Sequence, residues 1–396
     1  MTGERALRIY LVAGEESGDQ LGAGLMRALR AANPGRDIAF LGLGGERMRR
    51  EGLDPIFPME EISVMGILPV IAALPGIVRR AYRVIADVVA HDPDALIIID
   101  SPDFTQPIAR RVHRRAPHIA IVNYVSPSVW AWRPGRARKM RGYVDHVLAL
   151  KPFEPEAHRR LGGPPCSYVG HPLIEKRDLL RPGPGERAGA AEGPLELLVL
   201  PGSRRSELRR LAEPFAGALE RFRDGFAGEF RVTLPAVPHL VQEITALTRD
   251  WPVEPEIVVG EEAKFAAFRK AHLALAASGT VTLELALAGV PMVVAYKVSR
   301  LEEQLKYLIK VDTIVLANLI LGENVIREYI QADCNADNLG DALLALAVEG
   351  EARGRQVEAF TRLDQAMDIG EETPSGRAAR LVMHEIARVR ETRGRR

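Results

Sequence analysis

The sequence predicts an α/β protein with two doubly wound parallel-sheet domains that face each other across a cleft. Three observations predict this fold. The chain has 396 residues, a length that suits two domains better than one. Short, uniformly apolar runs alternate with helical patterns in both halves, as in parallel sheets that are covered on both faces. A stretch rich in glycine, proline and alanine, residues 181–194, separates the two halves.

In the first half, the opening apolar run RIYLVAG predicts a strand, and residues 18–32 predict a helix. Five further runs predict strands: IAFLGLGG, ALIIID, AIVNYVS, HVLAL and SYVG. After residue 194 the pattern restarts with LELLVLPGSR, and four more strands follow: RVTLPAV, EIVVG, LALAAS and MVVAYK. Each half therefore has enough alternating elements for one Rossmann-like domain.

The predicted organisation has four parts: a first domain at 1–180, a linker at 181–194, a second domain at 195–360 and a helical tail at 361–396. The tail is charged and ends in the basic run RVRETRGRR. It is interpreted either as a solvated terminus or as a helix that returns to the first domain, of its own or of a partner subunit.

Composition narrows the functional classes. Hydrophobic residues make up 47% of the chain, enough for a folded core, and the net charge of +1 gives no general attraction to nucleic acid. Cys166 and Cys334 have no CxxC partner, which favours a reducing compartment and gives no metal site. The first apolar run is too short for a signal peptide, so a cytoplasmic protein is expected.

The ends of two strands in the second half predict an anion site. LPGSRRSEL places Gly202, Ser203 and Arg204 in a tight turn before a helix, where backbone N–H groups and a guanidinium can bind phosphate. The alternative is a plain strand–helix turn with Arg204 solvated.

AASGTVTLE repeats this pattern with Ser278, Gly279 and Thr280, and Glu284 follows one helical turn later. A carboxylate there can accept hydrogen bonds from a ribose diol, although it can also serve only as a helix cap. Because both turns occur in the same domain, a nucleotide site is the favoured interpretation.

In the first half, LIIIDSPDF ends a buried strand with Asp100. A carboxylate at such a position can act as a general base, and the alternative is an Asx turn or a helix cap. The glycine-rich AGEESGDQLG contains Ser17 and Asp19. We expect both on the acceptor side, together with Trp130 and Arg133 of the aromatic and basic segment YVSPSVWAWRPGRARKMR.

Residues 63–78 form an uncharged run that is too short and too broken by proline to span a membrane, and Arg79, Arg80 and Arg83 follow it. We expect this segment to contact a membrane and admit acyl chains, with Ile67, Leu68 and Leu74 as its apolar side chains. The alternative is a pair of buried helices.

Seven motifs together resemble the lipid A disaccharide synthase family: AGEESGD, IDSPDF, YVSPSVWAWRPGR, VGHPL, LLVLPGSRRSE, ASGTVTLELALAGVPMVVAYK and NLILGE. They run from Ala13 to about Gln331 in family order and spacing. Two places depart from the family pattern. Ala317 stands where a proline is usual, and Arg327–Glu328 replaces a proline-led version.

The resemblance implies an inverting glycosyltransferase of GT-B architecture. Its donor would be UDP-2,3-diacylglucosamine and its acceptor 2,3-diacylglucosamine 1-phosphate, giving a β-1,6-linked disaccharide and UDP without a cofactor or metal. It also implies that Asp100 is the base and that Arg204, Glu284 and Asn318 serve the nucleotide sugar. Family members associate with the cytoplasmic face of the inner membrane, and a homodimer is compatible with the sequence.

Two other functions compete with this interpretation. A transferase or epimerase acting on a UDP-N-acetylhexosamine would need no long apolar surface. A nucleotide-sugar-binding module would need no carboxylate facing the donor. UDP release with and without an acylated acceptor separates the three.

Overall fold

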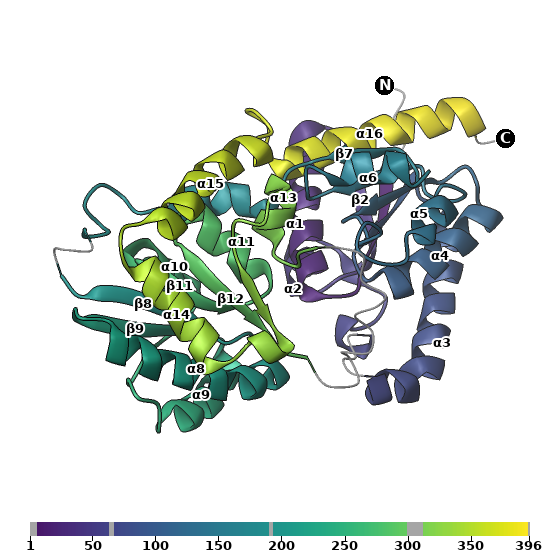
Figure 1. Ribbon diagram of the computed structural model, residues 1–396. Helices are drawn as coiled ribbons and strands as arrows, with labels where there is room; N and C mark the ends of the chain where they lie inside the picture. Colours follow the sequence, from purple (N-terminus) through teal and green to yellow (C-terminus); the bar gives the residue numbers. More distant parts are fainter. Residues whose placement is uncertain (1–5, 63–66, 190–192, 299–311, 395–396) are drawn as a thin grey trace. The chain divides into compact units, whose positions relative to one another are not determined.

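The structure is a computed structural model that describes residues 6–62, 67–189, 193–298 and 312–394, with the side chains of 67–72 outside the description. The chain divides into two compact α/β units (Figure 1). The first comprises the described residues of Met1–Pro172 and Ile369–Arg396, and the second those of Leu173–Asp368. Each unit is described separately.

The first unit is built on a seven-stranded parallel sheet of order β3-β2-β1-β4-β5-β6-β7. In this order the chain runs outward from β1 to one edge and then continues from β4 to the other, so the switch point lies between β1 and β4. The strands are β1 (Leu7–Ala13), β2 (Ile38–Leu43), β3 (Asp54–Pro55), β4 (Ala95–Ile99), β5 (Ala120–Tyr124), β6 (His146–Ala149) and β7 (Cys166–Tyr168).

Both faces of this sheet are buried, which explains why its strands are apolar throughout. Along β1, Leu7, Ile9 and Leu11 join one core cluster, and Tyr10 and Val12 join the cluster on the other face. The helices are α1 (Glu16–Ala32), α2 (Glu46–Arg50), α3 (Ile67–His91), α4 (Pro102–Arg115), α5 (Gly135–Met140), α6 (Glu154–Arg160) and α16 (Pro374–Arg393).

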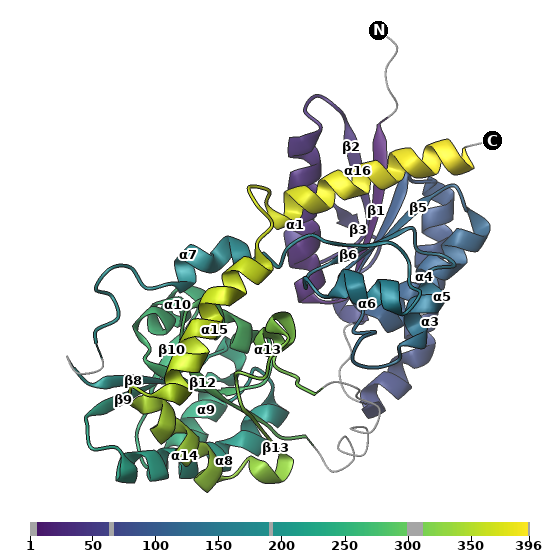
Figure 2. The same cartoon turned by 45° about the horizontal axis from the view of Figure 1, so that its top comes forward.

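The C-terminal helix α16 packs beside α1 on the first unit (Figure 2). Ala378, Val382 and Ile386 lie in the same core cluster as β1. The guanidinium of Arg393 binds the buried carboxylate of Asp145 at 2.6 Å. Most of the predicted tail therefore belongs to the first unit, whereas its start, up to Met367, lies in α15 of the second.

The second unit repeats the topology in a six-stranded parallel sheet of order β10-β9-β8-β11-β12-β13. Its switch point lies between β8 and β11. The strands are β8 (Leu195–Leu200), β9 (Phe230–Ala236), β10 (Glu256–Val259), β11 (Leu273–Ala277), β12 (Met292–Tyr296) and β13 (Glu328–Ile330). The helices are α7 (Arg177–Leu180), α8 (Arg205–Gly225), α9 (Val241–Thr248), α10 (Glu261–Lys270), α11 (Thr280–Leu287), α13 (Leu316–Leu321), α14 (Ala336–Ala347) and α15 (Glu351–Met367).

The residues predicted to form a linker are held to the second unit. The guanidinium of Arg187 donates to the carbonyls of Phe268, Ala288 and Gly289 at 2.9–3.1 Å. Helix α7, placed in the first domain by the sequence, packs against α10 and α11. The second unit consequently begins at Leu173, before the glycine-rich stretch.

A buried histidine makes the first unit sensitive to acid. His158 is fully buried, with Nε2 2.9 Å from the hydroxyl of Ser126, and burial lowers its pKa to about 4. Between pH 6.5 and 4 the unfolded chain binds a proton that the folded chain does not, so the free energy of unfolding rises with pH across this window.

We expect acidification from pH 6.5 to 4 to remove up to about 3 kcal/mol through His158 alone. Urea unfolding at several pH values should give a shallower dependence in His158→Gln. The free energy of unfolding of His158→Gln should still depend on pH, because burial also lowers the pKa of His171. Equal slopes for parent and variant would contradict this assignment.

Candidate functional site

The predicted nucleotide residues of the second unit, except Asn318, line one pocket at the carboxyl ends of its strands. The cavity measures about 500 Å³ and lies at the switch point, where β8 and β11 are neighbours. Its lining includes Gly202, Ser203 and Arg204 after β8, Ser278, Gly279 and Thr280 after β11, and Glu284 in α11. The alternation of strand and helix thus brings together two motifs that are more than 70 residues apart.

The turn after β8 requires glycine. Gly202 has φ +107°, and a Cβ on it would lie 2.5 Å from Oε2 of Glu207 and 2.8 Å from its Cβ. Glu207 accepts a hydrogen bond from Nη1 of Arg204 at 3.2 Å, and the Arg204 side chain remains 62% exposed. The arginine is therefore anchored beside the pocket with most of its guanidinium accessible.

Helices α8 and α11 begin directly beside this pocket. Arg204 is the residue before α8, and Thr280 is the first residue of α11. The free N–H groups of a helix start carry partial positive charge and can bind phosphate oxygens. Two helix starts and one exposed guanidinium form a site suited to a diphosphate.

Lys264 is a pocket residue that the sequence interpretation missed. Its Nζ lies 3.0 Å and 2.9 Å from the two carboxylate oxygens of Glu284, and both side chains are largely buried. Lys264 comes from the first turn of α10, which follows β10 and the left-handed Gly260. Its position after a strand and a glycine turn was the available signal, but the segment GEEAK contains no motif that separates it from surface lysines.

The side chain of Asn318 is hydrogen-bonded within its own part of the chain. It is buried, Nδ2 donates to the carbonyl of Ile326 at 2.8 Å, and Oδ1 accepts from the Ile326 N–H at 3.0 Å. It does not line the strand-end pocket. Asn318 therefore closes the loop after α13, and its expected role toward the nucleotide sugar stays a prediction.

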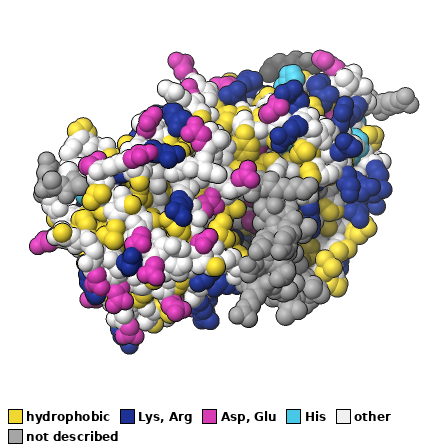
Figure 3. Space-filling view, in the orientation of Figure 1, with side chains coloured by type: hydrophobic (Ala, Val, Ile, Leu, Met, Phe, Trp, Pro, Cys, Tyr) yellow, Lys and Arg dark blue, Asp and Glu magenta, His cyan; other side chains and the backbone are white. Residues whose placement is uncertain are grey.

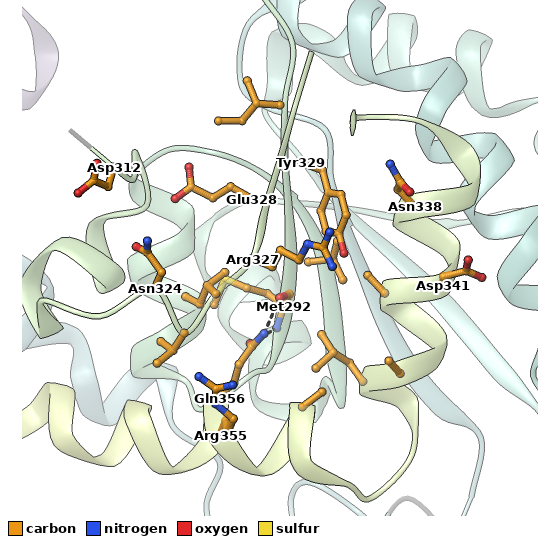
Figure 4. Close-up of a pocket in the computed structure, with 18 residues that line it drawn as sticks. Met292, Asp312, Asn324, Arg327, Glu328, Tyr329, Asn338, Asp341, Arg355 and Gln356 are labelled. Carbon is orange, nitrogen blue, oxygen red and sulfur yellow. Dashed lines mark hydrogen bonds between the residues drawn. The ribbon is translucent and has the colours of Figure 1, made fainter. Parts of the chain in front are cut away.

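The two departures from the family pattern also lie outside this pocket. Ala317 is buried in α13. Arg327 and Glu328 line a different cavity of about 810 Å³ along the edge strand β13, between α14 and α15. Figure 4 shows the guanidinium of Arg327 beside Tyr329, with Gln356 hydrogen-bonded to Met292 below them. These residues are therefore not in contact with the strand-end pocket.

In the first unit, Asp100 follows β4 directly at the switch point beside β1. Asp100 and Ser101 both have left-handed backbone conformations, φ 52° and 42°. Such strained positions concentrate at functional sites. Oδ1 accepts from the N–H of Ser101 at 2.9 Å, and Oδ2 is 3.5 Å from the hydroxyl of Ser17 after β1. Gly14 permits this turn, since a Cβ there would lie 2.6 Å from the Ser101 hydroxyl.

Asp19, predicted on the acceptor side, caps a neighbouring helix. It is buried, and its carboxylate accepts from the N–H groups of Gly45, Arg47 and Met48 at 2.8–3.0 Å. These are the free donors at the start of α2. The carboxylate therefore caps α2, and its role toward the acceptor stays a prediction.

Trp130, also predicted on the acceptor side, contacts α6 and the residue before it. Its indole N–H donates to the buried Glu154 at 3.2 Å, and its ring packs edge-on against Phe153. Of the two tryptophans in this segment, Trp132 is the exposed one. The guanidinium carbon of Arg133 lies 4.1 Å from the centroid of its ring. Arg133 remains on the surface, 3.5 Å from Asp103.

Helix α3 presents apolar side chains to solvent. Leu74, Val78 and Tyr82 are 51%, 44% and 47% exposed, and their spacing of four places them on one face. Arg79 is exposed, whereas Arg80 forms an ion pair with Glu61. The side chains of Ile67 and Leu68 lie outside the described residues. None of the described helices is long and apolar enough to cross a membrane.

Solved structures share this fold. S. aureus MnaA, in a structure with UDP, is 12% identical with a TM-score of 0.61, and each chain covers 98% of the other. Acinetobacter baumannii MurG is 16% identical with a TM-score of 0.55, covering 96% of this chain and 99% of its own. Two parallel α/β units of this kind define the chain as a protein of the GT-B glycosyltransferase fold class.

The particular family follows from sequence. Residues 9–381 match the family model described as lipid-A-disaccharide synthetase. The lipid-A-disaccharide synthase of Rhodopseudomonas palustris strain HaA2 is 54% identical over 380 residues, 96% of each chain, and that of Nitrobacter hamburgensis is 52% identical over 380 residues with the same coverage. The chain belongs to the lipid-A-disaccharide synthetase family and is a glycosyltransferase of lipid A biosynthesis.

Proposed function

We propose that the enzyme transfers 2,3-diacylglucosamine from its UDP derivative to 2,3-diacylglucosamine 1-phosphate, with inversion at the donor's anomeric carbon. The observation that carries this proposal is the placement of complementary groups at the two switch points. The second unit gathers groups suited to a nucleoside diphosphate, and the first places a carboxylate on a strained turn.

On the donor side, Arg204 and the starts of α8 and α11 bind the diphosphate. The pocket's size and its mixture of polar and apolar walls suit a nucleotide. Glu284 accepts hydrogen bonds from the ribose hydroxyl groups, and Lys264 orients its carboxylate.

On the acceptor side, Asp100 takes the proton from the attacking hydroxyl as its oxygen forms the new bond to the anomeric carbon. The bond from that carbon to the diphosphate breaks on the opposite face, and UDP carries away the electron pair. Positive charge in the pocket stabilises the diphosphate as negative charge develops on it. One base is sufficient because the leaving group is already a stable anion.

The donor assignment is tested by Arg204→Ala, with Arg205→Ala as the matched control. Arg205 is equally exposed, but it pairs with Glu243 and does not line the pocket. Removing the bidentate partner of a phosphate should weaken UDP binding about tenfold or more in calorimetry, since hydrogen bonds to charged groups contribute roughly 1.5–3 kcal/mol. Equal UDP affinity in the two variants would remove Arg204 from the site.

The exposed apolar face of α3 supports peripheral association with the cytoplasmic face of the inner membrane. In Figure 3, hydrophobic side chains gather over α3 at the lower right, with Lys and Arg above them. An apolar face with neighbouring cations is typical of interfacial helices.

Two serine substitutions on α3 test whether its exposed apolar face contributes to membrane binding rather than to stability. Leu74→Ser should change the free energy of unfolding by less than about 0.5 kcal/mol because Leu74 is exposed, and it should reduce binding to anionic liposomes. Val88→Ser on the same helix should destabilise by roughly 2–4 kcal/mol because Val88 is fully buried. A large stability loss in Leu74→Ser with unchanged liposome binding would argue against the membrane role.

A further inference from the structure

The turn that carries Asp100 joins β4 to α4 and holds two consecutive residues in an unfavourable conformation. Asp100 and Ser101 both have left-handed backbone dihedrals, and neither is a glycine. Such a turn persists only where the surrounding structure holds it in place. A general base must also keep its carboxylate within hydrogen-bond reach of the hydroxyl it deprotonates. The groups that fix this turn therefore bear on the reaction.

Thr105 holds the turn from inside the first unit. It lies near the start of α4, and its side chain is fully buried. A threonine inside a helix can donate to the carbonyl four residues earlier, which here belongs to Ser101. The Thr105 hydroxyl lies 3.1 Å from that oxygen but only 2.8 Å from the carbonyl oxygen of Asp100. The Ser101 carbonyl already accepts from the N–H groups of Phe104 and Thr105. The hydroxyl of Thr105 thus serves the backbone of Asp100 itself.

Glu15 holds the same turn from the surface. It is the exposed residue before α1, and its Oε1 accepts a hydrogen bond from the Ser101 hydroxyl at 3.2 Å. The backbone N–H of Ser101 in turn donates to Oδ1 of Asp100 at 2.9 Å. The loop after β1 therefore reaches the proposed base through one intermediate residue.

The start of α4 does not by itself require this conformation. The residue before a helix typically has an extended backbone, whereas Ser101 has φ 42° and ψ 57°. Two side chains from different elements, one buried and one exposed, nevertheless converge on the two strained residues. The strain and its two supports are therefore better explained by the placement of the Asp100 carboxylate than by the start of the helix.

We propose that Thr105 and Glu15 are positioning residues for the transfer reaction. Thr105 fixes the backbone of Asp100, and Glu15 fixes Ser101, so that the carboxylate stays oriented toward the acceptor hydroxyl. This inference rests on the proposed role of Asp100 as the base, and both residues act only through it. A displacement of about 1 Å at a reacting group can cost about 100-fold in rate, so the loss of either support is measurable.

The inner support is tested with Thr105→Val, which keeps the shape of the side chain and removes its hydroxyl. The variant should lower kcat by about 10- to 100-fold, with the KM of both substrates changed less than about threefold. Thr105→Ser keeps the hydroxyl and should retain nearly the parent kcat. Val112→Ala is the control for lost stability, because Val112 is fully buried in the same helix. It should lower the melting temperature without a comparable fall in kcat.

The outer support is tested with Glu15→Ala, whose exposed position leaves the core intact. This variant should lower kcat about three- to tenfold, the effect of losing one hydrogen bond. Glu15→Gln keeps an oxygen that accepts from the Ser101 hydroxyl and should restore most of the parent kcat. Glu16→Ala removes the same charge from the exposed neighbouring position and should have no such effect.

The deciding measurement repeats Thr105→Val in the Asp100→Asn background. The double variant should have the kcat of Asp100→Asn alone, because Thr105 acts only through the carboxylate. A further fall in the double variant as large as in the single one, an equal loss in Val112→Ala, or a parent-like kcat in Thr105→Val would overturn the positioning role. Parent-like turnover in Asp100→Asn would instead refute the base assignment, and the positioning role with it.

Discussion

Replacing Asp100 with asparagine is expected to lower kcat by at least about 100-fold while leaving UDP affinity nearly unchanged. Asparagine keeps the shape of the side chain, accepts from the Ser101 N–H as Oδ1 does now, and tolerates the left-handed backbone better than most residues. It cannot take a proton from the acceptor hydroxyl. The variant therefore removes the chemistry and retains the fold.

Asp54→Asn provides the control for Asp100→Asn. Asp54 is exposed on the edge strand β3 of the same sheet and undergoes the same loss of charge. Steady-state kinetics with both substrates should show parent-like kcat for Asp54→Asn. Near-normal turnover in Asp100→Asn would make Asp100 structural, and Asp103 or Asp19 would become the next candidate.

Glu284→Ala is expected to raise the donor KM by about 10- to 100-fold with a much smaller change in kcat. Ribose contacts hold equally in the ground state and the transition state, so their loss appears in binding rather than in the chemical step. The expected size follows from hydrogen bonds to a charged acceptor, about 1.5–3 kcal/mol. Calorimetry with UDP checks the binding part directly.

A substitution of Lys264 tests whether this lysine acts on the donor only through the carboxylate of Glu284. If Lys264 acts by holding Glu284, Lys264→Met should raise the donor KM less than Glu284→Ala does, again without a matching fall in kcat. The double variant should then be no worse than Glu284→Ala, because the lysine acts only through the carboxylate. Additive effects would show that Lys264 contacts the donor independently, and unchanged UDP binding in all three variants would dismiss the ribose assignment.

Sequence patterns predicted the strands, except the short edge strands β3 and β13, and the residues that follow them, for a physical reason. Parallel strands buried on both faces must be apolar throughout, so runs such as LIIID and LALAAS stand out, and the polar residue after each run is placed at the sheet's carboxyl edge. Asp100 directly after β4 and Arg204 at the end of the turn after β8 were placed in this way, whereas Glu284 lies in α11, the helix that follows β11. The same topology brings the turns after β8 and β11 together.

The roles of Asp19 and Asn318 could not be obtained in the same way. Their side chains satisfy backbone groups of α2 and of the loop near Ile326, and a sequence does not reveal which distant N–H a carboxylate or amide will meet. The family resemblance predicts that Asn318 serves the nucleotide sugar, and the structure adds its two hydrogen bonds to the backbone of Ile326. Likewise, the attachment of α16 depends on ion pairs such as Arg393 with Asp145, which are about 250 residues apart.

The most direct test of the account measures UDP release by the parent enzyme from UDP-2,3-diacylglucosamine, with and without 2,3-diacylglucosamine 1-phosphate, and determines the linkage in the product. The account predicts that UDP appears only with the acylated acceptor, in equal amount with a β-1,6-linked disaccharide. UDP release at the same rate without acceptor, or a disaccharide with retained anomeric configuration, would contradict it.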